Sequence, residues 1–311
     1  MSTAIYSHTE CRLHDMGPGH PECPQRLDAI NDQLLSSGLG ALLLHIDAPL
    51  ATREQLGRAH TANHVAELIE LLGGLQRDGE SRYLDPDTLA NPGTLQAALR
   101  AAGAAVAATE AVFRGELSNA FCAVRPPGHH ATRDQAQGFC FFNNVAVAAR
   151  HALDVLGLQR VAIIDFDVHH GNGTEDIVAG DERMLMCSFF QHPLYPSSGT
   201  EPLGENMVNV PVPPYSRGPV VRALVDAQWL PRLESFAPQM LFISAGFDAH
   251  REDDLGQLGL IEADYEWITR RIMEVAARHA QGRIVSCLEG GYALGAMARS
   301  VVAHVRVLAR A

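Results

Sequence analysis

A short apolar run, Val161–Ile164, is followed at once by Asp165, Asp167, His169 and His170. Such a run is typical of a strand that is buried on both faces, as in a parallel sheet. Burying carboxylate and imidazole groups without partners is costly, so their concentration beyond a buried strand requires a compensating interaction. A bound metal ion supplies one, and ligands in open α/β sheets bind beyond the carboxyl ends of the strands. The run therefore predicts an α/β sheet with a metal site at its edge.

Strand-like and helix-like stretches alternate along the chain, which is typical of a mostly parallel sheet with helices on both faces. The predicted strands are Ala120–Val124, Val161–Ile164, Met184–Ser188, Met240–Ser244 and Arg283–Leu288. The predicted helices are Pro24–Ser37, His64–Leu72, Thr94–Phe113, Asn143–Leu156, Val220–Ser235, Ala263–Ala280 and Leu294–Ala309. Because no repeat or separating linker is present, we expect a single domain over residues 1–311.

Composition excludes several classes of protein. No apolar run approaches the roughly 20 residues of a membrane helix, and the N-terminus lacks a signal-peptide pattern, so we expect a cytoplasmic protein without membrane contact. The 6 cysteines include no Cys-x-x-Cys pair, which favours free thiols. The net charge of −12 disfavours direct nucleic-acid binding and permits cationic partners such as lysine-bearing peptides or polyamines.

Polar residues follow four of the predicted strands. They are Arg125–His130, Asp165–His169, Asp248 and Glu289–Tyr292. Since the carboxyl ends of parallel strands lie at one edge of a sheet, all four segments are expected to meet in one crevice. A lone Asp at a strand end is more often a cap or a surface group, but Asp167, His169 and Asp248 together offer two carboxylates and one imidazole. That set suits zinc, or iron(II), with positions left open for water and substrate.

Several longer motifs resemble one known family, the zinc-dependent histone deacetylases with their bacterial relatives, the acetylpolyamine amidohydrolases and acetoin-utilisation proteins. The resemblance covers essentially the whole chain and is closest to the class II branch. The matching motifs are His20-Pro-Glu-x-Pro-x-Arg26, Arg125-Pro-Pro-Gly-His-His130, Gly138-Phe-Cys-Phe-Phe-Asn143, Asp165-Phe-Asp-Val-His-His-Gly-Asn172, Ser244-Ala-Gly-Phe-Asp248 and Glu289-Gly-Gly-Tyr292. The family implies a three-layer arginase–deacetylase fold and an amide-hydrolysing, zinc-dependent deacetylase with Asp167, His169 and Asp248 as zinc ligands.

The resemblance also implies catalytic roles. His129 and His130 would flank the zinc-bound water, with Asp165 holding His129 and Asn172 holding His130. Tyr292 would polarise the substrate carbonyl. These roles agree with general chemistry, because zinc lowers the pKa of bound water, a neighbouring histidine can take the proton, and a phenol can stabilise the oxyanion of amide cleavage. A carboxylate behind His129 and an amide behind His130 predict two different imidazole pKa values.

The family pattern further predicts a substrate tunnel. Gly138, Phe139, Tyr195 and Leu255 would line the tunnel that admits the acyl-lysine chain, although the family usually has Phe where this chain has Tyr195. Arg26 would lie in an internal channel associated with acetate release.

A structural potassium site is expected from the resemblance alone. Its residues would be Asp165, Asp167, His169, Ser188 and Phe189.

The arginase branch of this fold, with two manganese ions, is disfavoured because it requires a second Asp where this chain has His250. The role of His250 is left open.

The choice of substrate is open as well. Leu255 favours acyl-lysine, since polyamine-specific relatives have an acidic residue there. Acidic groups beside it and in another rim loop would attract either cation; these are Glu252, Asp253, Asp254, Asp85 and Asp87.

Three functions are therefore carried forward. The first is a zinc amidohydrolase that removes acetyl or other acyl groups from lysine. The second is a deacetylase of polyamines or other small molecules. The third is a silent binder of acylated ligands or a metal buffer, which the complete set of site residues disfavours.

Overall fold

The computed structural model describes residues 2–311, and in this part of the chain eight parallel strands form one sheet. Their spatial order is β2 (Leu44–Asp47), β1 (Thr3–Ser7), β5 (Asn119–Cys122), β10 (Ile284–Leu288), β9 (Met240–Ala245), β6 (Val161–Asp165), β7 (Met184–Gln191) and β8 (Met207–Val212). A small antiparallel hairpin, β3 (Arg82–Tyr83) with β4 (Leu89–Ala90), lies outside this sheet.

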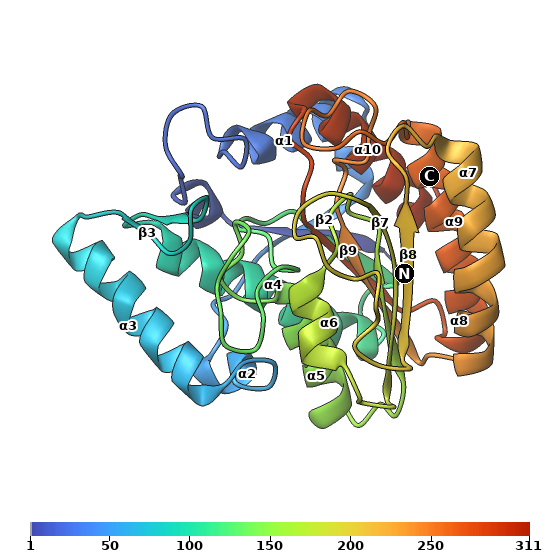
Figure 1. Cartoon of the computed structure of the whole chain (residues 1–311), viewed down its shortest axis with the longest axis horizontal. Coiled ribbons are helices and arrows are strands. Elements are labelled where there is room, and N and C mark those ends of the chain that lie inside the picture. Colours follow the sequence, from blue (N-terminus) through green and yellow to red (C-terminus); the bar gives the residue numbers. More distant parts are fainter. Residues whose placement is uncertain (1) are drawn as a thin grey trace.

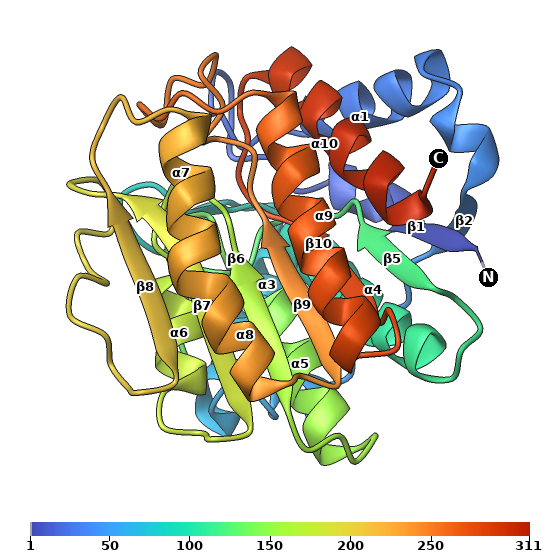
Figure 2. The same cartoon turned by 90° about the vertical axis from the view of Figure 1, so that its right-hand side faces the viewer.

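Helices cover both faces of the sheet and complete the three layers, which Figure 1 shows from the side. One face carries α1 (Gln25–Ser36), α7 (Gly218–Leu224), α8 (Leu230–Phe236), α9 (Glu262–His279) and α10 (Leu294–Ala309), and α7 to α10 stand in front of the sheet in Figure 2. The other face carries α2 (Arg53–Leu56), α3 (Ala62–Asp78), α4 (Thr94–Phe113), α5 (Asn144–Asp154) and α6 (Asn172–Val178). None of the helices within residues 2–311 is long and apolar enough to span a membrane. The predicted three-layer α/β fold is thus confirmed.

The elements that the sequence analysis missed lie mainly at the edges of the sheet. β1 and β2 form one edge and β8 the other. β2 lacks an apolar run, because its four residues are exposed or half-buried. β8 carries Pro211, which is tolerated in an edge strand because one side of that strand needs no ladder bond. Edge strands are only partly covered, so they lack the apolar signature of the central strands.

The stretch Val220–Ser235 was predicted as one helix and is wrong in detail. α7 is followed by a π-helical turn, Val225–Trp229, before α8 begins. Pro231 lies in the first turn of α8 and has no N–H to donate to the carbonyl of Ala227. A wider turn before the proline accommodates this missing bond.

The sheet places four loops side by side. β5, β10, β9 and β6 are neighbours, although they are not consecutive in the chain. Their register puts Cys122, Cys287, Ser244 and Asp165 in one row at the carboxyl edge. The four loops that follow begin one or two residues later, so the segments that carry the polar motifs meet at the point where strand order departs from chain order.

Candidate metal centre and active site

Asp167, His169 and Asp248 come together beyond the ends of β6 and β9. The Nδ1 atom of His169 lies 3.0 Å from Oδ1 of Asp167 and 3.2 Å from Oδ2 of Asp248. One ligand atom from each residue lies within 4.8 Å of the others. Both carboxylates are buried and the imidazole is nearly so. The three groups therefore converge as a metal-binding set would.

Backbone N–H groups orient the two carboxylates. Oδ2 of Asp167 accepts a hydrogen bond from the N–H of Gly290 at 2.8 Å, and Oδ1 of Asp248 accepts one from the N–H of Val168 at 2.9 Å. The donors belong to the loops after β10 and β6. Each carboxylate is thus held by a loop other than its own, which reduces the reorganisation needed to bind a cation.

Two glycines make room for these carboxylates. A Cβ atom on Gly246 would lie 2.0 Å from Oδ2 of Asp167, and one on Gly290 would lie 2.0 Å from Oδ2 of Asp248. A side chain at either position would displace one of these carboxylates. The sequence analysis quoted both glycines within motifs without giving them this role, although their place directly after strand ends was the available signal.

The electrostatics of the set favour a bound cation. Burial and the nearby charge of Asp167 raise the pKa of Asp248 to about 7, against the hydrogen bond from His169. Burial alone would lower the pKa of His169, but its hydrogen bonds with Asp167 and Asp248 raise it to about 10. Two buried carboxylates that repel each other are relieved by a divalent cation. Two carboxylate oxygens and one imidazole nitrogen fit zinc or iron(II).

The tandem histidines lie beside the metal-binding set. Nδ1 of His129 lies 2.9 Å from Oδ2 of Asp165, and Nδ1 of His130 lies 2.7 Å from Oδ1 of Asn172. The ring centroids of His129 and His130 are 4.0 Å apart. Gly171 allows the first pair to form, since a Cβ atom there would lie 2.3 Å from Oδ2 of Asp165.

The two imidazoles have opposite pKa shifts. Burial would lower the pKa of His129, but the charges of Asp167 and Asp165 raise it well above its usual value. Burial and the neighbouring His129 and His169 lower the pKa of His130 well below its usual value. The pair therefore combines an imidazole whose pKa shift favours the protonated form with one whose pKa shift favours the neutral form, in the direction expected from a carboxylate behind one ring and an amide behind the other.

Glu289 supports the loop that carries His129 and His130. Its Oε2 accepts hydrogen bonds from the N–H groups of Gly128 at 2.7 Å and His129 at 3.1 Å. Its Oε1 accepts one from the hydroxyl of Ser244 at 3.0 Å. Burial raises the pKa of Glu289 to about 7, against the charge of His129. The sequence analysis placed this residue in the crevice but did not foresee its supporting contacts.

Tyr292 follows Gly291, whose φ of +119° is open to glycine and strained for other residues. The Tyr292 ring lies 6.0 Å from the Phe139 ring, nearly perpendicular to it, and 5.0 Å from Cζ of Arg26. Burial raises the pKa of the Tyr292 phenol well above its usual value, although Arg26 opposes this. The hydroxyl therefore keeps its proton at neutral pH and remains a hydrogen-bond donor.

Arg26, the predicted channel residue, is fully buried beneath this loop. Its guanidinium donates to the carbonyl oxygens of Gly291 at 2.7 Å and Glu289 at 2.5 Å, and to Oε1 of Glu22 at 3.1 Å. Glu22 in turn accepts two hydrogen bonds from Arg125, at 2.5 and 2.6 Å. Burial would raise the pKa of Glu22, but Arg125, His14 and Arg26 lower it to about 2. The observed contacts give Arg26 a supporting position under the Tyr292 loop.

Three predicted tunnel residues lie near one another. Gly138 and Phe139 both have positive φ, and their N–H groups donate to Oδ2 of Asp85 at 3.0 Å and Oγ1 of Thr88 at 2.9 Å. The Tyr195 ring lies 5.1 Å from the His130 ring. A Cβ atom on Gly138 would approach both rings, at 2.7 Å from His130 and 2.9 Å from the Tyr195 hydroxyl.

Leu255 is half-buried, and its N–H donates to Oδ1 of Asp253 at 3.1 Å. Its place in the tunnel stays a prediction.

Two further residues of the sequence analysis belong to the predicted potassium site. Ser188 pairs with Asp165 across β6 and β7, and Phe189 stacks on Trp229 with ring centroids 5.6 Å apart. The potassium site itself stays a prediction.

His250 has a structural explanation. Its Nδ1 accepts the N–H of Glu252 at 3.2 Å, and its Nε2 lies 3.5 Å from Oε2 of Glu262. One ring nitrogen thus accepts a backbone N–H and the other faces the carboxylate of Glu262, and a role as a metal ligand is not needed to account for it.

Comparisons with known proteins agree with this geometry. Residues 20–308 match the family described as the histone deacetylase domain. The chain is 39% identical over 314 residues to a histone deacetylase-like amidohydrolase of Pseudomonas aeruginosa, with 93% of this chain and 81% of that protein covered. It is 35% identical over 332 residues to the polyamine deacetylase HDAC10 of Mus musculus, with 98% of this chain but 48% of that protein covered.

The fold also matches a solved structure. The crystal structure of the HDA15 HD domain superposes with a TM-score of 0.91 at 33% sequence identity, and the match covers 99% of this chain and 90% of that one.

Proposed function

The chain belongs to the histone deacetylase family of amide-hydrolysing enzymes, and from this premise we propose that it is a zinc-dependent deacetylase that removes acetyl or other acyl groups from lysine side chains. One observation carries the proposal. The metal-binding set of Asp167, His169 and Asp248 lies beside an oppositely titrating pair, His129 and His130, at the sheet edge that also holds the Tyr292 loop.

The metal would be held by Asp167, His169 and Asp248. When bound, zinc supplies a Lewis acid and a water molecule whose pKa is lowered to about 7. Iron(II) fits the same ligands, and a structural potassium ion beside β6 and β7 belongs to the proposal as well. The remaining chemistry falls to side chains of this chain.

His130 is proposed as the general base. Its low pKa keeps the ring neutral, and its Nδ1–H donates to Oδ1 of Asn172, so Nε2 is free to accept a proton from the attacking water. The same nitrogen then donates that proton to the leaving amine. His129 stays protonated against Asp165 and contributes a fixed positive charge beside the reacting centre.

Tyr292 is proposed to donate a hydrogen bond from its hydroxyl to the carbonyl oxygen of the substrate. The raised pKa keeps the phenol protonated, and the donation strengthens as negative charge develops on that oxygen. The Arg26 contacts with Glu289 and Gly291 hold this phenol in place before the substrate arrives.

The choice of acyl-lysine over acetylpolyamine rests on the acidic rim. The carboxylate of Asp85 accepts the N–H groups of Gly138 and Thr88, and Glu252 pairs with Arg299 at 2.8 Å. Asp253 is buried. Glu252 is therefore paired with a cation and Asp253 is withdrawn from the surface, whereas Asp87 and Asp254 are exposed, so the rim keeps part of the negative charge that the sequence suggested.

The alternative function is a deacetylase of polyamines or other small molecules. It is favoured by the similarity to a polyamine deacetylase. N-acetylputrescine keeps one ammonium group, and an acyl-lysine peptide is cationic where other lysines flank the acylated one, so both suit a protein with a net charge of −12. Six free cysteines support a reducing, cytoplasmic setting, and neither function calls for nucleic acid or a membrane.

The test compares initial rates on an acetyl-lysine peptide and on N-acetylputrescine, with zinc-loaded protein and with Tyr292→Phe as the blank. Faster turnover of the peptide, lowered about 100-fold or more in the blank, is expected. Faster turnover of N-acetylputrescine would favour the alternative. Stoichiometric zinc without turnover of either substrate, even with longer acyl chains, would indicate a silent binder.

A further inference from the structure

Asp253 is a buried carboxylate that joins two loops of the site. Its Oδ1 accepts the N–H of Leu255 at 3.1 Å, while its Oδ2 accepts the N–H groups of Tyr292 at 2.6 Å and Ala293 at 2.9 Å. Only 5% of its surface is exposed. One side chain thus spans the loop after β9 and the loop after β10.

The negative charge of Asp253 is satisfied by backbone N–H groups. Within residues 2–311, no Lys, Arg or His side chain forms an ion pair with it. A charged acceptor forms stronger hydrogen bonds with N–H groups than a neutral one does. Two of the three donors immediately precede α10, whose N-terminal end also favours a negative charge. These bonds therefore favour one relative position of the two loops.

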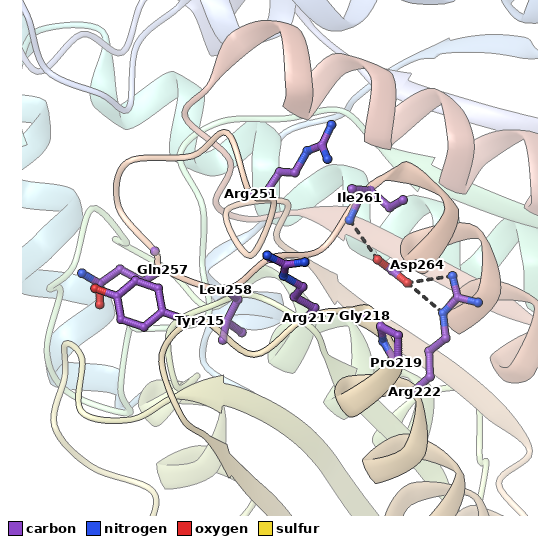
Figure 3. A pocket seen from close by; sticks show the side chains of 12 residues that line it. Tyr215, Arg217, Gly218, Pro219, Arg222, Arg251, Gln257, Leu258, Ile261 and Asp264 are labelled. Atoms are coloured by element: carbon purple, nitrogen blue, oxygen red, sulfur yellow. Dashed lines mark hydrogen bonds and ion pairs between the residues drawn. The ribbon is translucent and has the colours of Figure 1, made fainter.

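The loop that carries Asp253 lies between a cavity on its outer side and the metal centre on its inner side. Arg251 and residues 256–259 line a cavity of about 750 Å³, and Figure 3 shows Gln257 and Leu258 on its wall. On the inner side the loop approaches the metal centre closely, since a Cβ atom on Gly256 would lie 2.7 Å from the carbonyl oxygen of Asp248. Backbone hydrogen bonds of Arg251, Gln257 and Gly259 hold the two ends of this loop, and Asp253 holds the middle of it.

We propose that Asp253 is a positioning residue that couples the segment of Leu255 to the loop of Tyr292. The inference rests on the proposed function, in which Tyr292 donates to the substrate carbonyl and Leu255 borders the acyl-lysine tunnel. Asp253 touches neither substrate nor metal. It holds the backbone of the proton donor and the backbone of the tunnel residue in one fixed relation.

The isosteric variant Asp253→Asn tests this role. Its amide keeps one acceptor oxygen but replaces the other with an NH₂ group, which opposes an N–H donor of one of the two loops. A shift of the phenol by about 1 Å lowers kcat by up to about 100-fold. We expect at least a 10-fold loss of kcat on an acetyl-lysine peptide with zinc content unchanged. Asp78→Asn, which alters an exposed acid at the end of α3, away from the site, is the control and is expected to change kcat less than 2-fold.

A double-mutant cycle separates positioning from general destabilisation. If Asp253 acts through Tyr292, Asp253→Asn lowers the residual rate of the Tyr292→Phe protein less than 2-fold, because the hydroxyl it positions is already absent. Equal losses of rate in both backgrounds would overturn the inference. The ratio of rates on acetyl and longer acyl chains is also expected to change in Asp253→Asn, since the Leu255 segment moves.

Hydrogen–deuterium exchange of the wild-type protein gives a second test that requires no variant. Peptides containing Leu255 and Tyr292–Ala293 are expected to be protected to the same degree and to lose protection together as denaturant is added. Independent exchange of the two segments would overturn the coupling. Absence of turnover by the wild-type enzyme would instead overturn the proposed function, so the two failures are distinct.

Discussion

The guanidinium of Arg26 donates a hydrogen bond to the carbonyl oxygen of Gly291 at 2.7 Å, and so links helix α1 to the residue before Tyr292. The guanidinium also donates to the carbonyl oxygen of Glu289, the residue before Gly290. The N–H of Gly290 in turn donates to the carboxylate of Asp167. One buried cation thus supports both the metal-binding and the phenol-bearing parts of the loop after β10. A lysine cannot reproduce this arrangement, because it lacks the planar fork of donors.

Arg26→Lys is expected to lower kcat by about 10- to 100-fold, because the Tyr292 loop loses its fixed geometry. Zinc content should stay near one ion per chain, since no ligand is changed. Initial rates and metal analysis on the same preparation measure both. Arg12→Lys, which alters a surface ion pair with Asp28, is the control and should leave the rate within 2-fold. An unchanged rate in Arg26→Lys would contradict the supporting role.

Asp248→Asn removes one of the two carboxylate ligands. We expect the affinity for zinc to fall by at least about 100-fold, because the loss of a residue that only supports a ligand already costs about 10- to 100-fold. Activity should fall together with the zinc affinity. Titration against a chromophoric zinc chelator measures the affinity directly. Asp254→Asn removes an exposed acid from the same loop and should retain wild-type affinity. Equal affinities in the two variants would exclude Asp248 as a ligand.

Gly290→Ala places a methyl group where a Cβ atom meets Oδ2 of Asp248 at 2.0 Å. Overpacking of this kind costs about 1–3 kcal/mol in the free energy of unfolding, and the displaced carboxylate should also weaken zinc binding. Gly295→Ala is matched in chemistry but has only the end of Arg299 nearby, at 3.5 Å, and lies in α10. The control should be neutral or slightly stabilising, because alanine favours helix. Denaturant titrations and zinc affinities of both variants test the contrast.

His304 gives a pH dependence that is separate from catalysis. Burial between Thr269 and Ser286 lowers its pKa from about 6.5 to about 3. The unfolded chain therefore takes up this proton first as the pH falls below 6.5. Stability linked to His304 is complete above that pH and is lost progressively down to about pH 3.

His304→Gln should accordingly reduce the slope of unfolding free energy against pH by about 1.4 kcal/mol per unit between pH 6 and pH 4. Denaturant midpoints at a series of pH values give the slope. Above pH 7 the two proteins should have parallel curves, which is the internal control. Parallel curves throughout would mean that the histidine is already protonated in the native state.

The central strands were predictable because they are buried on both faces. Val161–Ile164 and Met240–Ile243 are continuous apolar runs, and the predicted strands Val161–Ile164 and Met240–Ser244 each end within one residue of the observed strand. β2 and β8 were missed because edge strands are only partly covered and carry polar residues or proline. The break in the predicted helix Val220–Ser235 before Pro231 could have been inferred from the sequence, since proline cannot donate the helical hydrogen bond.

Residue type and order by themselves determined the candidate metal-binding set and its location. Asp167, His169 and Asp248 follow buried parallel strands, and the carboxyl ends of such strands share one edge, so their convergence followed from the sequence. Only the tertiary structure decided what holds the site together. Glu289, Asp253 and Arg26 act on backbone N–H and carbonyl groups of distant loops. Nearly every residue carries those groups, so such contacts leave no pattern in the sequence and appear only once the loops are placed side by side.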